Sequence, residues 1–158
     1  MKVEKTVIAL GFFDGVHRGH GALLRKAAER AGELGAVPAV FTFDRSPREF
    51  VTGTPVPLLN SNDIFNSKKI LLSINFSNDD RRDIIRRVYG IERVIFARFD
   101  QAMMTMGWED YIQMLVRDYG AVHFVAGHDH RFGHRNEGTV ALLQAKCVEL
   151  GLGCDIIP

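Results

Sequence analysis

Apolar and polar residues alternate along the chain in segments that predict strand and helix in turn. Short apolar runs rich in β-branched and aromatic residues predict five buried strands, at 5–11, 37–43, 93–99, 121–126 and 154–157. Between them, apolar residues recur at helical spacing and predict helices at 19–34, 80–89, 108–119 and 137 or 138–150. This alternation predicts a Rossmann-like, doubly wound α/β fold, with a parallel sheet of about five strands and flanking helices.

Composition agrees with one soluble globular domain over residues 1–158. The chain is 46% hydrophobic and 25% charged, with a formal net charge of +1. These values give no electrostatic case for nucleic-acid or membrane binding, and no apolar run approaches the roughly 20 residues of a membrane helix. The cysteines are Cys147 and Cys154, and the N-terminus lacks a secretory pattern. We therefore expect a cytoplasmic protein.

Two segments interrupt the alternation. Residues 44–60 contain Pro47, Pro55 and Pro57 and predict a loop. Residues 60–79 are rich in asparagine and contain no arginine, unlike the rest of the chain. We expect residues 62–79 to be an insertion, either a plain surface excursion or a flap. A flap at residues 64–79 would pack on the body or mediate self-association with a second chain.

Residues 11–20, of sequence GFFDGVHRGH, lie where the first strand ends and the first helix begins. A helix start offers unpaired N–H groups and partial positive charge, which suit phosphate, and glycine lets the backbone approach an anion. His17 and His20 add donors, and positive charge when protonated. The stretch therefore predicts a phosphate-handling site. Two alternatives stay open: ordinary surface histidines, or zinc ligands, although Asp14 is the only carboxylate nearby and cysteine is absent.

Two further loops follow predicted strands, with sequence TFDRSPRE at 42–49 and GHDHRFGHR at 127–135. Because the carboxyl ends of parallel strands meet at one edge, we expect all three loops to converge there. The loop at 127–135 is rich in donors and contains two glycines, which favours anion or nucleotide recognition. A solvated charged loop is the first alternative. The second is a metal site made of His128, His130, His134 and Asp129.

Together these motifs resemble the FMN adenylyltransferase domain of bacterial bifunctional FAD synthetases (riboflavin kinase/FMN adenylyltransferases), within the H-x-G-H nucleotidyltransferase superfamily. Residues 11–20 resemble the family signature G-[NF]-F-D-G-V-H-x-G-H. The loops at 42–47 and 127–133 resemble its T-F-D-P-x-P and G-x-D-F-R-F-G motifs. Arg45, Ser46 and His130 depart from the family, which usually has proline, commonly histidine, and phenylalanine at those positions.

The resemblance implies adenylyl transfer from ATP to FMN, giving FAD and pyrophosphate, with Mg²⁺ accompanying ATP and no protein-held metal. It implies that His17 and His20 are catalytic. The implied ATP-binding residues are Gly11, Phe13, Asp14, Gly15, His17, His20, Gly127, Asp129 and Arg131. The implied flavin-binding residues are Asp44, Pro47, Arg48, Asp129 and Phe132.

The chain stops at Pro158, before the family's I-S-S-T-x-I-R motif and its riboflavin kinase domain. We therefore expect a truncated adenylyltransferase domain. Joining Asp63 to Asp80 would restore the family's usual spacing, in agreement with an insertion at 62–79. Three alternatives stay open: another H-x-G-H transferase with a different phosphate-bearing substrate, a nucleotide- or flavin-binding domain without turnover, and a metal-binding scaffold.

Overall fold

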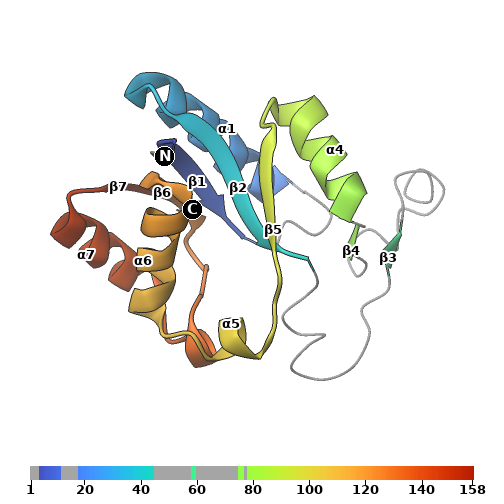
Figure 1. Cartoon of the computed structure of the whole chain (residues 1–158). Coiled ribbons are helices and arrows are strands. Elements are labelled where there is room, and N and C mark those ends of the chain that lie inside the picture. The colour runs from blue at the N-terminus through green and yellow to red at the C-terminus, as the bar shows by residue number, and fades with distance from the viewer. Residues whose placement is uncertain (1–3, 12–17, 45–57, 60–74, 77) are drawn as a thin grey trace.

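A computed structural model of the protein describes residues 4–11, 18–44, 58–59, 75–76 and 78–158 (Figure 1). Its main sheet has five strands in the order β5-β2-β1-β6-β7. These strands are β1 (Thr6–Leu10), β2 (Val37–Phe43), β5 (Arg93–Ala97), β6 (Ala121–Gly127) and β7 (Gly153–Ile157). Every neighbouring pair is parallel, which confirms the predicted sheet.

Helices cover both faces of this sheet, as the alternation of elements predicts. They are α1 (Arg18–Leu34), α4 (Asn78–Tyr89), α5 (Gln101–Thr105), α6 (Trp108–Tyr119) and α7 (Val140–Leu150), with a short 3-10 helix η1 (His134–Asn136). Figure 1 shows α1 and α4 on one side of the sheet, and α6 and α7 on the other. In the described part of the chain, no helix is both long and apolar enough to cross a bilayer.

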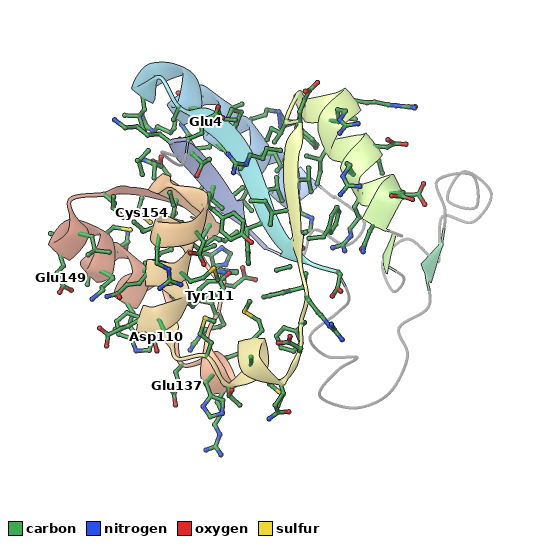
Figure 2. All side chains as sticks on the ribbon, in the orientation of Figure 1. Glu4, Asp110, Tyr111, Glu137, Glu149 and Cys154 are labelled. Atoms are coloured by element: carbon green, nitrogen blue, oxygen red, sulfur yellow. The ribbon has the colours of Figure 1, made fainter. Side chains whose placement is uncertain are left out.

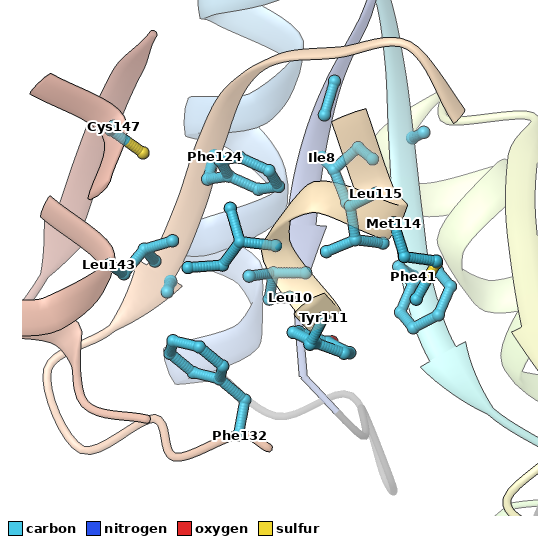
Figure 3. Packing of buried hydrophobic residues seen from close by; sticks show 14 residues of the cluster. Ile8, Leu10, Phe41, Tyr111, Met114, Leu115, Phe124, Phe132, Leu143 and Cys147 are labelled. Atoms are coloured by element: carbon cyan, nitrogen blue, oxygen red, sulfur yellow. The ribbon is translucent and has the colours of Figure 1, made fainter. Parts of the chain in front are cut away.

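Two clusters of buried residues fill the space on the two faces. One packs β1 and β2 against α1 and α4, and includes Val7, Leu24 and Ile85. The other packs the opposite face against α6 and α7, and includes Phe41 and Leu115. Figure 3 shows this second cluster, with Tyr111 and Phe132 at one end of it. Side chains of alternate strand residues point to opposite faces of the sheet. All five residues of β1 are buried, so both faces of this strand are covered.

Most predicted elements end within two residues of the observed ones, and the start of α7 is the main correction. The helix was expected from 137 or 138 but begins at Val140. Thr139 has an extended backbone, and its side-chain oxygen accepts a hydrogen bond from the Leu142 amide at 3.2 Å. Gly138 instead pairs with Phe132 in an antiparallel bridge, which commits it to an extended conformation.

A short helix, a small second sheet and the 3-10 helix η1 were not expected. The helix α5 follows β5, which ends at Ala97 and not at 99. A second sheet pairs β3 (Leu58–Leu59) with β4 (Asn75–Phe76) in parallel, so part of the predicted loop at 44–60 is strand. Residues 45–57, 60–74 and 77 lie outside the described residues, and the insertion at 62–79 stays a prediction.

The strand order determines where a ligand fits. From β1 the chain moves outward through β2 to β5, and then returns to the other side of β1 to form β6 and β7. The order therefore reverses between β1 and β6. In open parallel sheets, this switch point leaves a crevice at the carboxyl ends of the strands. The first turn of α1 lies beside that crevice.

Candidate active site

A cavity of about 220 Å³ opens at the switch point; we call it the α1 cavity. Its lining comes from α1, from the loop after β6 and from the end of β7: His20, Leu23, Gly127, His128, Asp129, Ile157 and Pro158. Three residues predicted to bind ATP, namely His20, Gly127 and Asp129, therefore meet in one cavity. Their convergence follows from the topology, since β1 and β6 are neighbours in the sheet.

Backbone hydrogen bonds hold the loop after β6 at this cavity. The His128 amide donates to the Ile157 carbonyl at 2.8 Å, which ties the loop to the end of β7. The His130 amide donates to the Gly127 carbonyl at 3.0 Å and closes a turn. His20 is the third residue of α1, whose first turn contains no acidic side chain. A helix start suits an anion, through its N–H groups and the positive end of the helix dipole.

A second cavity, of about 100 Å³, lies farther along the same loop; we call it the aromatic cavity. It is lined by Phe43, Phe99, Met103, Met104, Tyr111, His130, Arg131, Phe132, Gly133 and Asn136. Only Phe132 and Arg131 of this set were predicted site residues. Phe132 was expected to bind flavin, in keeping with an aromatic wall, whereas Arg131 was expected to bind ATP.

The rings of the aromatic cavity are stacked and edge-packed. Phe43 and Phe99 meet edge to face with centroids 5.0 Å apart. Tyr111 stacks on Phe132 at 5.4 Å, and Phe132 stacks on His130 at 5.8 Å. Tyr111, labelled in Figure 2, belongs to α6 and is buried. Burial raises the pKa of Tyr111, so its hydroxyl stays neutral.

His130 is the polar end of this stack. Burial lowers its pKa to about 4, because a charged imidazolium is poorly solvated there, although the nearby Asp129 carboxylate acts in the opposite direction. The ring is therefore neutral near pH 7. Its Nε2 atom is buried and has no hydrogen-bond partner among the described residues.

Packing between α6 and the loop defines one wall of the aromatic cavity. Gly133 has φ of 79°, and a Cβ built on it would lie 2.8 Å from the Cα of Trp108. Glycine is therefore required both by the left-handed backbone and by the close approach of α6. The His134 amide also donates to the Met106 carbonyl at 2.8 Å, which fixes the loop to the α5–α6 connection.

The methionines of the aromatic cavity lie on α5, which the sequence analysis missed. The sequence feature that could have indicated α5 is Asp100. Its side-chain oxygen accepts a hydrogen bond from the Met103 amide at 3.0 Å and caps the helix. An aspartate followed by Gln-Ala-Met-Met matches a helix start, but five residues are too few to show helical periodicity. Long-range packing, and not local pattern, brings Met103 and Met104 to the cavity.

Buried Arg81 of α4 fixes the end of β2, from which Phe43 reaches the aromatic cavity. Its guanidinium donates to the Thr42 hydroxyl at 3.2 Å and to the Phe43 carbonyl at 2.7 Å. Asp44, predicted to contact flavin, lines neither cavity in the described part of the chain. Its carboxylate instead accepts a hydrogen bond from the Phe99 amide at 3.3 Å. Asp44 thus joins the ends of β2 and β5.

The remaining predicted residues are placed as follows. Gly11 is half-buried directly after β1. Phe13, Asp14, Gly15, His17, Pro47 and Arg48 lie outside the described residues.

Within the described residues, no group of three His, Cys, Asp or Glu side chains gathers closely enough to hold a metal ion. The loop histidines therefore do not form the alternative metal site: His128 borders the α1 cavity and His130 the aromatic cavity.

Comparison with known proteins decides the family. The family model described as FAD synthetase matches residues 1–158. This chain belongs to the FAD synthetase family. Over 146 residues, it is 32% identical to a bifunctional riboflavin kinase/FMN adenylyltransferase of Pseudomonas fluorescens, covering 92% of this chain and 42% of that protein. The protein of the same name from Escherichia coli K12 is 30% identical over 149 residues, covering 94% of this chain and 42% of that protein.

The chain thus spans less than half the length of these two FAD synthetase relatives. Among solved structures, a crystal structure described as a macrolide-efflux protein from Streptococcus pneumoniae matches the fold with a TM-score of 0.76. That match covers 100% of this chain and 47% of the other, at 23% sequence identity. At this identity the match supports the fold alone.

Proposed function

We propose that this chain transfers the adenylyl group of MgATP to FMN, giving FAD and pyrophosphate. One observation carries the proposal: a single loop borders both cavities. Gly127 and Asp129 line the α1 cavity, and Phe132 lines the aromatic cavity a few residues later. A phosphate-binding helix start beside a ring-binding pocket suits the two halves of FAD. The names of the relatives, FMN adenylyltransferases, support the same reaction.

In this proposal the ATP phosphates bind at the start of α1. An oxygen of the FMN phosphate bonds to the α-phosphorus of ATP. The bond from that phosphorus to the bridging oxygen breaks, and pyrophosphate leaves with the electron pair. No protein nucleophile is needed, so positioning and charge neutralisation supply the catalysis. His20 would donate to the oxygens of the α-phosphoryl group, and His17, Gly11, Phe13, Asp14 and Gly15 keep their predicted roles at the phosphates and adenylate.

Mg²⁺ would enter as part of the nucleotide substrate. Mg²⁺ commonly takes one or two carboxylates, with phosphate oxygens and water completing its shell. Asp129 is the carboxylate that lines the α1 cavity in the described part of the chain, so the donor set fits a metal carried by ATP. When bound, the ion supplies charge neutralisation at the phosphates, and Asp129 would hold it beside Gly127.

The flavin ring would bind in the aromatic cavity. Phe132, Phe43 and Phe99 line the cavity and offer apolar contact. At about 100 Å³ the cavity is smaller than a typical ligand pocket, of roughly 300–1,000 Å³. Two methionines line it, Met103 and Met104, whose unbranched side chains adapt readily to a larger ligand. The flavin-side roles of Asp44, Pro47, Arg48 and Asp129 stay predictions, and we add Arg131, which lines this cavity.

We further propose a cytoplasmic location for this reaction. Cys147 and Cys154 are free thiols, as is usual in a reducing compartment. Self-association through 64–79 stays a prediction, because these residues lie almost wholly outside the described part of the chain.

The test is FAD formation from FMN and MgATP, with FAD separated chromatographically and pyrophosphate measured in parallel. Calorimetric titration with ATP and with FMN accompanies the assay. We expect equal amounts of FAD and pyrophosphate. Binding of both ligands without product would instead identify a non-catalytic binding domain. Pyrophosphate release only with another phosphate-bearing acceptor would identify a different transferase of the superfamily.

A further inference from the structure

The buried Nε2 atom of His130 has no role in the chemistry described above. It lies within the stack of rings that ends at the aromatic cavity, and it lacks a hydrogen-bond partner among the described residues. Burying a polar group without a partner costs folding free energy, so such atoms in native proteins are few. Since His130 itself lines the aromatic cavity, a ligand bound there is the candidate for the missing partner.

Packing alone does not explain a histidine at this position. A phenylalanine would stack on Phe132 equally well and would bury no polar atom. The family motif that residues 127–133 resemble has phenylalanine here, so the loop accommodates that ring. The neutral imidazole adds one N–H donor and one ring-nitrogen acceptor to a wall otherwise rich in aromatic and methionine side chains.

We propose that His130 is a specificity-determining residue for the flavin, and that its Nε2 forms a hydrogen bond with the edge of the bound ring. The inference rests on the proposed function, because it takes the aromatic cavity as the flavin site. A flavin ring carries carbonyl oxygens and ring nitrogens along one edge, and methyl groups along the other. Only the polar edge can satisfy Nε2. The pyrimidine edge of the ring therefore faces His130, and the methyl-bearing edge faces away.

The test compares flavin binding by three variants with binding by the unchanged chain. His130→Phe removes the nitrogen and keeps the ring, and His130→Gln keeps a polar group. His134→Phe is the matched control, because His134 is in the same loop but does not line the aromatic cavity in the described structure. Dissociation constants for FMN and riboflavin are measured from flavin fluorescence, and those for ATP by calorimetry. Melting temperatures are recorded for every variant.

We expect His130→Phe to weaken FMN binding by about 10-fold or more, because the ring edge loses its partner in a desolvated site. Riboflavin should lose affinity by the same factor, since the contact is with the ring and not the phosphate. ATP affinity should not change. The melting temperature should stay the same or rise, because a buried unpaired nitrogen is removed. His130→Gln should retain most of the FMN affinity, and His134→Phe should match the unchanged chain.

Several outcomes would overturn the inference. If His130→Phe binds FMN as tightly as the unchanged chain, His130 does not select the flavin, while the proposed function stands. If ATP affinity falls together with FMN affinity, the residue acts through the fold and the inference fails. If the unchanged chain binds no FMN, both proposals fall. Should His130→Phe not fold, His130→Leu is compared with His130→Gln, and equal FMN affinity in those two variants overturns the inference.

Discussion

His20 lies where a helix start meets the carboxyl edge of the sheet, in the first turn of α1 and at the wall of the α1 cavity. Backbone N–H groups there can bind phosphate in the ground state and in the transition state alike. A side-chain donor adds to catalysis when it binds the transition state more tightly. At the scale of single residues, His20 is thus the group on which turnover should depend most.

We expect His20→Ala to lower the rate of FAD formation by about 100-fold or more, a loss typical of removing one preorganised donor. The KM for FMN should change little, because the aromatic cavity is intact. Single-turnover rates with saturating MgATP would measure the effect. His20→Gln, which retains a donor, should recover part of the rate. A near-wild-type rate for His20→Ala would remove the residue from the mechanism.

Gly133 gives a second prediction at the residue scale. Gly133→Ala should destabilise the protein by more than the about 1–2 kcal/mol expected for a left-handed alanine, because the new Cβ also collides with Trp108. Gly151→Ala is the reference for an alanine at positive φ without a collision: its φ is 71° and its ψ 30°, against 79° and 178° at Gly133, and apart from its chain neighbours no atom lies within 4 Å of the added Cβ. Urea unfolding of both variants compares the two losses. Equal losses would mean that α6 moves away without cost.

At the scale of elements, Asp155 joins α1 to the two strands beneath it. Its carboxylate accepts hydrogen bonds from Arg30 of α1, at 2.7 and 3.2 Å. It also lies 2.7 Å from Nε2 of His123 in β6. The bond from Arg30 is the largest cause that holds the pKa of Asp155 below its usual value, and His123 contributes further. The carboxylate therefore stabilises the fold in its ionised form.

This linkage predicts a pH-dependent effect of Asp155→Asn. A lowered carboxyl pKa stabilises the folded state above the unfolded-state pKa of about 4, and this contribution disappears as pH falls through the folded-state pKa. At pH 7 the variant should therefore unfold at a lower urea concentration than the unchanged chain. At pH 3 and below, the difference should shrink. Asp118→Asn, at an exposed pair with Arg117, is the control and should have little effect. A difference that does not vary with pH would contradict the linkage.

The elements also show what a single sequence can predict. Strands were predictable as continuous apolar runs, because both faces of the sheet are buried, and long helices because burial of one face imposes a helical period. The meeting of His20 and Gly127 was predictable because the topology brings both to one edge of the sheet. The aromatic cavity was not predictable in the same way. Its wall depends on the contact of Phe43 with Phe99 and on the short helix that carries Met103. Such contacts join distant segments and leave no local pattern.

At the scale of the whole molecule, the five strands of the main sheet pair only with one another in the described structure. β3 and β4 pair with each other in a sheet of their own. This pairing is in keeping with the prediction that residues 62–79 are an insertion.

We expect removal of residues 64–77, with Asp63 joined to Asn78, to leave a folded protein. Asn78 is kept because its side chain accepts a hydrogen bond from Arg81. The shortened chain should unfold cooperatively and bind ATP as the full chain does. Circular dichroism, thermal unfolding and calorimetry would measure this, and gel filtration of both chains would test self-association. A shortened chain without a cooperative transition would show that the segment is part of the folding unit and not an insertion.

The loop after β6 has a consequence for how the protein can change. Gly127 to Asp129 and His130 to Gly133 are consecutive, yet they line different cavities, to which we assign different substrates. A substitution that moves this loop to admit a bulkier nucleotide in the α1 cavity would also move the residues that line the aromatic cavity, where we place the flavin. Under the proposed function, preferences for the two substrates should therefore change together. Variants selected in the laboratory for a new acceptor should accumulate compensating changes at the α1 cavity before their turnover rate recovers.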